Sequence, residues 1–275
     1  MAQFSTEKNT LLDNNNALYE VDMLSTLSGL PVSNSNPFPV ANFQLQIARG
    51  LVQGITALSI SGYNAAVSST WAPLWEIGTP YVYFSSAQVV RIWSDNAADT
   101  NVSVLINGLD INYDIITETV VLTNGVTGVL TTKQFFRINN LQTVGSVNAV
   151  GLVHAGSSDK TITLAAKVGG SGRSQMTVYT VPNGYTFYLA QVNVVTNQNG
   201  NQYANYRSFT QQPNGLITRI LQFPLTTNYN SIKIVPRPYA EKTDIQWQCN
   251  ASASSQIGGQ IEGYLISNTN AITGV

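Results

Sequence analysis

The chain has 275 residues, of which 43% are hydrophobic and only 10% are charged, and its formal net charge is −1. Soluble domains usually carry about 25% charged residues, so this surface lacks the charge that normally keeps soluble monomers apart. A subunit buried in a permanent assembly would have less need of that charge. The nearly neutral balance also gives no basic footprint for nucleic acid, and we expect no nucleic-acid partner.

Membrane insertion and disulfide bonding are not expected either. No apolar run approaches the ~20 residues of a membrane span, and the first residues lack the basic and apolar pattern of a signal peptide. The single cysteine, Cys249, excludes an intrachain disulfide framework and most cysteine-based metal sites. We expect Cys249 to be a small buried residue on a strand spanning 244–250.

Residues 1–45 differ in composition from the rest of the chain. Asn-rich and Pro-rich turns at 14–16, 33–36 and 37–39 are typical of loops, yet the apolar side chains between them are too many for a freely solvated tail. We therefore predict an extended N-terminal arm that lies against its own domain or against a neighbouring subunit. Its candidate partner contacts are Leu11, Leu12, Leu18, Tyr19, Met23 and Leu24.

The segment from 43 to 84 contains predicted strands and an aromatic cluster. Residues 43–61 alternate apolar and polar side chains, which predicts strands, and 64–70 is a polar loop. The aromatic residues that follow would usually supply core area at one end of a sandwich. The alternative is a surface on which carbohydrate rings stack. The candidate glycan or partner contacts are Trp71, Trp75, Tyr81 and Tyr83.

The stretch from 91 to 140 gives the clearest fold signal in the sequence. Short apolar and β-branched runs alternate with Asn-Gly, Asn-Gly-Leu-Asp and Ser-Asp-Asn sequences. Asn, Asp and Gly tolerate the positive φ angles that hairpin turns need. No part of the chain shows a helical period of comparable strength. This pattern predicts an antiparallel β core.

The second half of the chain repeats the same pattern of strands and turns after a glycine-rich segment at 169–172. Gly-Gly-Ser-Gly is typical of flexible linkers, and seven or eight strands at this spacing suit a sandwich or jelly roll. We therefore predict an all-β protein with two β-sandwich or jelly-roll domains and an extended N-terminal arm. The expected boundaries are 1–45 for the arm, 46–168 for the first domain and 174–275 for the second, jelly-roll-like domain.

Two stretches carry a resemblance to a known family. The first has Gly-Leu-Asp at 108–110, then Tyr113, then Glu-Thr-Val-Val-Leu-Thr-Asn-Gly at 118–125. The second, at 177–189, is Thr-Val-Tyr-Thr-Val-Pro-Asn-Gly-Tyr-Thr-Phe-Tyr-Leu. Together they resemble a domain that recurs in structural proteins of tailed bacteriophages, especially marine ones. In those proteins Asn183 corresponds to a small residue and Tyr185 to a lysine, so the chain departs from the pattern at that turn.

Few side chains could carry chemistry. His154 is the only histidine, so a histidine metal cluster or a histidine pair is excluded, and no Gly-x-Ser-x-Gly elbow accompanies it. Carboxylate pairs for glycoside hydrolysis are scarce. Asp95 and Asp99 have oxygen ligands that suit Ca²⁺ but lack the spacing of a calcium loop, and they favour Asx-turn capping. We expect no catalytic residue, no metal and no cofactor.

The sequence therefore favours a non-enzymatic bacteriophage virion protein, assembled in the bacterial host cytoplasm. The first hypothesis is a capsid decoration or cement protein that bridges and stabilises the major capsid protein lattice as a homo-oligomer, with a trimer favoured. The alternatives are a neck, tail or baseplate component, or a receptor- or glycan-binding module of the virion. A polysaccharide depolymerase is the remaining enzyme hypothesis, and the scarcity of carboxylates disfavours it.

Overall fold

A computed structural model describes residues 3–5, 10–12, 18–20, 43–197, 203–252 and 254–269 of the chain. These residues are almost entirely in antiparallel strands and their turns, which confirms the predicted all-β class. The one helix among them, α1 (Phe43–Ala48), has six residues. It is not long or apolar enough to span a membrane. The chain divides into two units, Met1–Leu51 and Val52–Val275.

The first unit contains a small antiparallel sheet rather than a fully extended arm. Its strands are β1 (Gln3–Ser5), β2 (Thr10–Leu12) and β3 (Leu18–Glu20), paired in the order β1-β2-β3. Two of the paired positions join candidate contact residues, Leu11 with Tyr19 and Leu12 with Leu18. The other two candidates, Met23 and Leu24, lie outside the described residues.

The strand predicted for residues 43–61 is wrong in its first part, because 43–48 form α1. Glutamine, leucine and alanine dominate this segment and are good helix formers. Arg49 N donates to Leu45 O, and Gly50 then takes a φ of 71°, a left-handed angle typical of a helix end. The strand begins only at β4 (Ile55–Val67), which runs on through part of the predicted polar loop.

The second unit contains two hydrophobic cores. The first core lies between two sheets of strand order β10-β7-β8 and β12-β11-β6-β9. On β7 the buried residues alternate with half-buried ones, as expected for a strand with one face on the core. The strands are β6 (Gln88–Ser94), β7 (Val102–Leu109), β8 (Ile115–Leu122), β9 (Val129–Phe135), β10 (Arg137–Val144), β11 (Val153–Gly156) and β12 (Thr163–Lys167).

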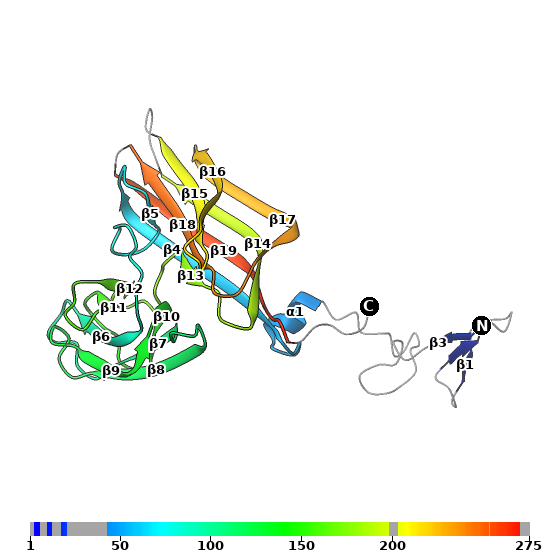
Figure 1. The fold of residues 1–275 in the computed structure, drawn as a ribbon, viewed down its shortest axis with the longest axis horizontal. Coiled ribbons are helices and arrows are strands. Elements are labelled where there is room, and N and C mark those ends of the chain that lie inside the picture. Colours follow the sequence, from blue (N-terminus) through cyan, green and yellow to red (C-terminus); the bar gives the residue numbers. More distant parts are fainter. Residues whose placement is uncertain are drawn as a thin grey trace. The chain divides into compact units, whose positions relative to one another are not determined.

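The second core also lies between two sheets, drawn mainly in yellow, orange and blue in Figure 1. One sheet has the order β13-β18-β15-β16, with β5 on the edge of β18, and the other has the order β17-β14-β19-β4. The remaining strands are β5 (Ala72–Pro73), β13 (Val178–Thr180), β14 (Tyr185–Thr196), β15 (Ala204–Gln211), β16 (Ile217–Leu225), β17 (Asn228–Tyr239), β18 (Asp244–Ala251) and β19 (Ser255–Ser267).

The division of the chain between the cores differs from the predicted domains. β4 pairs along its length with β19, and β5 pairs with β18, so both belong with the C-terminal strands. The first core is formed by residues between Trp75 and Val178, inserted between β5 and the rest of the second core. Both cores lie in one compact unit. The jelly-roll topology of the second half stays a prediction.

The glycine-rich segment at 169–172 is not a free linker. Its flanks are hydrogen-bonded to the first core, from Gly170 N to Ala149 O, from Thr143 N to Gly172 O and from Ser174 N to Leu141 O. A Cβ on Gly169 would lie 2.1 Å from Val150 O. Close packing of backbone against backbone therefore explains this glycine, and the predicted boundary at 168–174 does not coincide with the change of core.

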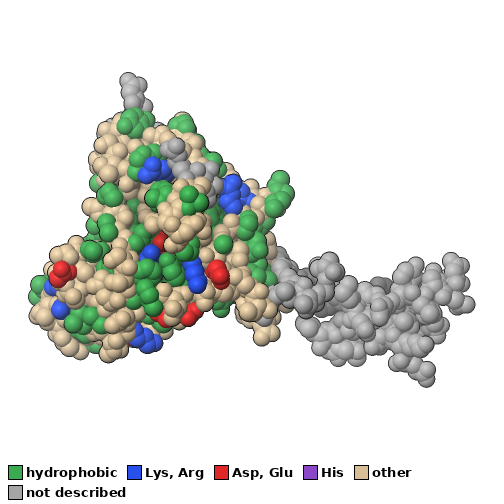
Figure 2. All heavy atoms as spheres, viewed as in Figure 1, with side chains coloured by type: hydrophobic (Ala, Val, Ile, Leu, Met, Phe, Trp, Pro, Cys, Tyr) green, Lys and Arg blue, Asp and Glu red, His purple; other side chains and the backbone are tan. Residues whose placement is uncertain are grey.

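The surface carries few charges, as the composition requires. Figure 2 shows mostly uncharged polar atoms and backbone, with hydrophobic side chains between them and only scattered Lys, Arg, Asp and Glu. Cys249 is fully buried on β18, which confirms the prediction for that residue. Burial raises the pKa of its thiol.

Candidate functional site: a polar joint between the two cores

A buried ion pair joins the two cores. Arg137 begins β10 of the first core and Asp244 begins β18 of the second. Arg137 Nε lies 2.9 Å from Asp244 Oδ1, and Arg137 Nη2 lies 2.9 Å from Asp244 Oδ2, so the contact is bidentate. Both residues are almost inaccessible, with 6% and 3% exposure. A planar guanidinium matches a carboxylate in this geometry.

The remaining polar atoms of the pair are also satisfied. Arg137 Nη1 donates to Phe84 O and to Phe136 O, each at 3.0 Å. Thr180 Oγ1 donates to Asp244 Oδ1 at 2.6 Å. Burial by itself lowers the pKa of Arg137, but the hydrogen bonds and charge of Asp244 outweigh it, and the pKa is raised above its usual value. The two side chains thus satisfy one another, and removing one member would leave the other buried without its partner.

Aromatic rings enclose the guanidinium. Its carbon lies 3.8 Å from the ring centroid of Phe136, 4.5 Å from that of Tyr83 and 5.7 Å from that of Tyr113. A cation over an aromatic face is stabilised by about 0.5–2 kcal/mol, with the larger values in desolvated sites. These rings exclude water from Arg137, and the ion pair is correspondingly less screened.

A second contact between the cores mimics strand pairing. Asn139 Nδ2 donates to Thr180 O at 3.0 Å, and Thr180 N donates to Asn139 Oδ1 at 2.9 Å. The carboxamide of Asn139 on β10 thus occupies the place of a peptide group beside β13. The backbone N–H and C=O of Thr180 are both hydrogen-bonded to Asn139, so the first core covers the edge of β13 at this residue.

The two stretches that resemble phage structural proteins meet at the same joint. Asp110 accepts hydrogen bonds from Asn112 N and Asp114 N, which shapes the turn after β7 and leaves Tyr113 at a φ of 68°. Asn183, in the turn between β13 and β14, donates its backbone N–H to Tyr113 O at 2.8 Å and its side-chain amide to Asp114 Oδ1 at 2.9 Å.

The turn at 183–184 is itself supported from the second core. Gly184 has a φ of 75° and donates its N–H to Glu241 Oε2 at 2.6 Å. Asn183 thus has a defined structural role where the resembling family has a small residue. The joint thus links the turn at 110–114 in the first core with the turn at 183–184 in the second. The guanidinium of the buried ion pair lies 5.7 Å from the ring centroid of Tyr113 in the first of these turns.

Sequence reasoning missed the two central residues of this joint. Arg137 stands inside the apolar run Phe-Phe-Arg-Ile at 135–138, and Asp244 is the first residue of the strand predicted at 244–250. Charged residues are almost never fully buried unless they are paired, so a charge inside an apolar strand was the available signal. Nothing in the sequence indicated that these two residues, 107 positions apart, would pair.

The four aromatic residues predicted as a glycan or partner surface do not form one exposed surface. Trp75 and Tyr81 are buried in the first core, at 2% and 9% exposure, and Tyr83 packs against it. Trp71 lies apart from that core, with the Arg207 guanidinium 4.3 Å from its ring centroid. The core-forming interpretation therefore accounts for Trp75 and Tyr81.

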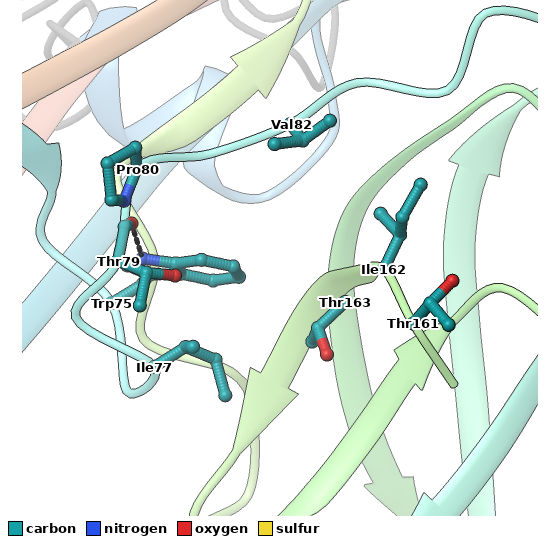
Figure 3. A pocket seen from close by; sticks show the side chains of 8 residues that line it. All are labelled: Trp75, Ile77, Thr79, Pro80, Val82, Thr161, Ile162 and Thr163. Atoms are coloured by element: carbon teal, nitrogen blue, oxygen red, sulfur yellow. Dashed lines mark hydrogen bonds between the residues drawn. The ribbon is translucent and has the colours of Figure 1, made fainter.

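Trp75, whose ring packs against Tyr81, borders a small pocket of about 200 Å³, and Figure 3 shows the residues that line it. The indole N–H of Trp75 donates to Thr79 O at 2.8 Å, so its polar atom is already satisfied. The ring has no face exposed for stacking. The lining residues are Trp75, Ile77, Thr79, Pro80, Val82, Thr161, Ile162 and Thr163.

The side chains considered for catalysis or metal binding are used in local structure. His154 Nε2 lies 3.0 Å from Asp95 Oδ1, and its ring stacks on Trp93. Burial lowers the pKa of His154, and the charge of Asp95 opposes that shift only in part. The nearby Ser157 Oγ donates to Asp159 Oδ1 at 2.5 Å, not to the histidine. This arrangement lacks a nucleophile activated by a base.

Asp99 links the end of β6 to the segment at 150–151. It accepts hydrogen bonds from Ser94 Oγ, Val150 N and Gly151 N at 2.5–3.0 Å. Burial raises its pKa, but these hydrogen bonds outweigh that effect and the pKa of Asp99 is lowered. Within the described part of the chain, no three His, Cys, Asp or Glu side chains come together as a metal site would require.

Comparisons with known proteins identify no family for the chain. No family model and no curated protein matches it. Among solved structures it is similar to a mutant VP2 protein of infectious bursal disease virus, from derived T=1 particles, with 10% identity over 78% of this chain and 70% of that one. The TM-score is 0.21, and a likeness this weak carries no argument about the fold or the function.

Proposed function

We propose that this chain is a structural subunit of a bacteriophage virion and has no enzymatic role. The resemblance of 108–125 and 177–189 to phage structural proteins is the sequence support for this proposal. The structure adds that the two resembling stretches hydrogen-bond to each other through Asn183, Tyr113 and Asp114. The motif residues therefore serve to hold two β cores together, which is a building role.

The observation that carries the proposal is the buried joint. A bidentate ion pair, a reciprocal side-chain to backbone contact and two interlocked turns connect the cores. Polar groups buried in this way restrict the relative orientation of the parts that they connect. A subunit that must keep its shape within a shell benefits from such a joint. The sparse surface charge also favours a permanent assembly over a dispersed monomer.

Within the virion we propose a capsid decoration or cement protein, bound to the major capsid protein and self-associated, with a trimer as the favoured oligomer. The neck, tail or baseplate is the competing location. The apolar residues of the N-terminal segment, Leu11, Leu12, Leu18, Tyr19, Met23 and Leu24, remain the proposed partner contacts. A glycan-binding role through the aromatic cluster is disfavoured, because Trp75 and Tyr81 are buried.

Copy number tests this proposal. Purified particles of the source phage are separated on a quantitative gel, and the band of this chain is compared with that of the major capsid protein. Hundreds of copies per particle support decoration. A handful to a few dozen copies indicate a neck, tail or fibre position instead. Absence of the chain from purified particles contradicts the virion proposal itself.

A further inference from the structure

Three of the four most exposed large hydrophobic side chains of the described residues lie together on one strand. Ile234 on β17 is 100% exposed, Val235 is 81% exposed and Ile232 is 72% exposed. Figure 2 shows hydrophobic side chains along the margin of the molecule over β17. Single exposed apolar residues are ordinary, but a cluster of large ones on one element indicates a contact surface.

β17 is also an edge strand among the described strands. The sheet has the order β17-β14-β19-β4, so within the described part of the chain β17 is paired on one side only. Thr196 N donates to Thr227 O, and in an antiparallel ladder the hydrogen-bonded positions alternate. Residues 229 and 231 therefore face β14 with their peptide groups, and those of Asn228, Asn230 and Ile232 point away from the sheet.

The pairing with β14 stops beyond Ile232. Gln191 is opposite Ile232, but Leu189 is opposite Arg237, so four residues of β17 face a single residue of β14. This bulge contains Ile234 and Val235 and places them outward. Bulges and prolines usually protect sheet edges from pairing, and Pro236 and Pro238 have no N–H to donate. The edge available for pairing thus ends at Val235.

The opposite edge of the sheet is less available. β4 is the other outer strand, and Ser59 O on it accepts a hydrogen bond from Arg173 Nη2 at 3.2 Å. A contact that joined β17 of one copy to β4 of the next would give a ring or an open filament, whereas a contact between two copies of β17 closes as a pair. The difference between the two edges favours the closed contact.

We propose that β17 pairs antiparallel with β17 of a second copy of this chain, about a twofold axis at Ile232. This inference rests on the proposed role as a self-associating virion subunit and identifies one of its contacts. The axis places Ile232 opposite its own counterpart and Asn230 opposite Ile234 of the partner copy, on the outer face. Asn230 and Ile232 have outward peptide groups, so ladder hydrogen bonds can form at the axis, and Ile234 lies in the bulge just beyond it.

The charges of β17 fit a second copy in this register. Lys233 is the one charged residue between 228 and 235, and its Nζ lies 2.5 Å from Ser231 Oγ. About the proposed axis Lys233 is opposite Ser231 of the partner copy, so no like charges face each other directly. Like charges directly opposite would destabilise the pairing. Apolar packing of Ile232 and Ile234 across the axis then covers the exposed cluster.

A twofold contact is compatible with trimers, because it would join one trimer to another. If the subunit is a dimer only, the same contact accounts for the whole assembly. In either case the oligomer contains an even number of chains. Loss of the contact halves the mass of that oligomer, and this change can be measured on the purified protein without any phage particle.

The test uses the full chain and two matched variants. Ile234→Lys adds a charge to the proposed contact, and Val150→Lys adds the same charge at a loop residue before β11 that is 76% exposed. Molar mass is measured by light scattering after size exclusion, with circular dichroism to verify folding. We expect an even multiple of 29.7 kDa for the wild type and for Val150→Lys, and half that mass for Ile234→Lys. An unchanged mass in folded Ile234→Lys overturns the proposal.

A cysteine placed on the axis tests the register. Opposed residues in a hydrogen-bonded antiparallel pair have Cα atoms about 5.5 Å apart, which lies within the disulfide range of about 4.4–6.8 Å. Ile232→Cys treated with an added oxidant should give a covalent dimer on a non-reducing gel, and Val150→Cys should not. The native Cys249 is fully buried and does not interfere. Equal cross-linking of both variants, or none at Ile232→Cys, contradicts the register even where particle copy number supports a virion role.

Discussion

Replacing Arg137 by methionine should destabilise the protein strongly, because the buried carboxyl group of Asp244 loses its bidentate partner and keeps only the side-chain hydrogen bond from Thr180 Oγ1. Asp244 is 3% exposed, so water cannot replace the lost guanidinium without opening the joint. Removing one partner of a buried ion pair typically costs about 3–5 kcal/mol. The lost ring contacts of Arg137 with Phe136 and Tyr83 add to that cost.

Urea unfolding measures the effect directly. We expect the midpoint of Arg137→Met to fall while the slope stays near that of the wild type. Arg91→Met is the matched control, since Arg91 donates to Ser158 O and Thr127 O at exposed positions and should matter little. In the double variant Arg137→Met with Asp244→Leu no unpaired charge remains, so its loss should be smaller than the sum of the two single losses.

This reasoning would be refuted by a folded Arg137→Met whose stability lies within about 0.5 kcal/mol of the wild type, the range usual for surface substitutions. Strict additivity of the two single changes would also refute it, because residues that interact directly are coupled by about 0.5–3 kcal/mol. Either result would mean that the pair contributes nothing to the joint.

Three further predictions address single residues. The thiol of Cys249 should react with Ellman's reagent only after denaturation, because it is buried and its pKa is raised; rapid reaction in native buffer would show that β18 opens. Burial lowers the pKa of His154 below 6.5, so the unfolded state takes up a proton before the folded state does. The free energy of unfolding should therefore decline as pH falls below about 6.5. Urea titrations of the wild type and His154→Gln at pH 7.5 and 5.5 should show the decline in the wild type alone. Gly108→Ala should destabilise the chain or alter the joint, because the new Cβ would lie 2.3 Å from Arg137 O. A thermal melting midpoint equal to that of the wild type would disprove this close approach.

The sequence predicted the fold class correctly because the relevant signals are local. Hairpin turns at Asn-Gly and Asp-rich positions and period-two alternation on strands such as β7 depend on neighbouring residues only. Asp99 was expected to cap a local Asx turn, but it accepts hydrogen bonds from Val150 N and Gly151 N, 51 and 52 residues away, a contact that no local pattern indicates. Cys249 was correctly expected to be buried on a strand.

The pairing of distant strands was beyond that reasoning. β4 and β19 are joined over most of their length, yet about 190 residues separate them, and no local pattern indicates the pairing. The same limit hid the contact between Arg137 and Asp244. Gly169 was mistaken for part of a linker because a glycine needed for close packing and a glycine in a flexible segment look alike in the sequence.

Cryo-electron microscopy of the phage particle tests whether this chain is a fixed-shape subunit of the capsid surface. We predict density for both β cores of this chain, in one constant relative orientation, at repeated positions on the outer surface of the major capsid protein lattice. Density confined to the neck, tail or baseplate would contradict the decoration role and leave the structural one. A particle without density for this chain, or with the two cores in variable relative orientations, would contradict the proposal that it is a fixed-shape structural subunit.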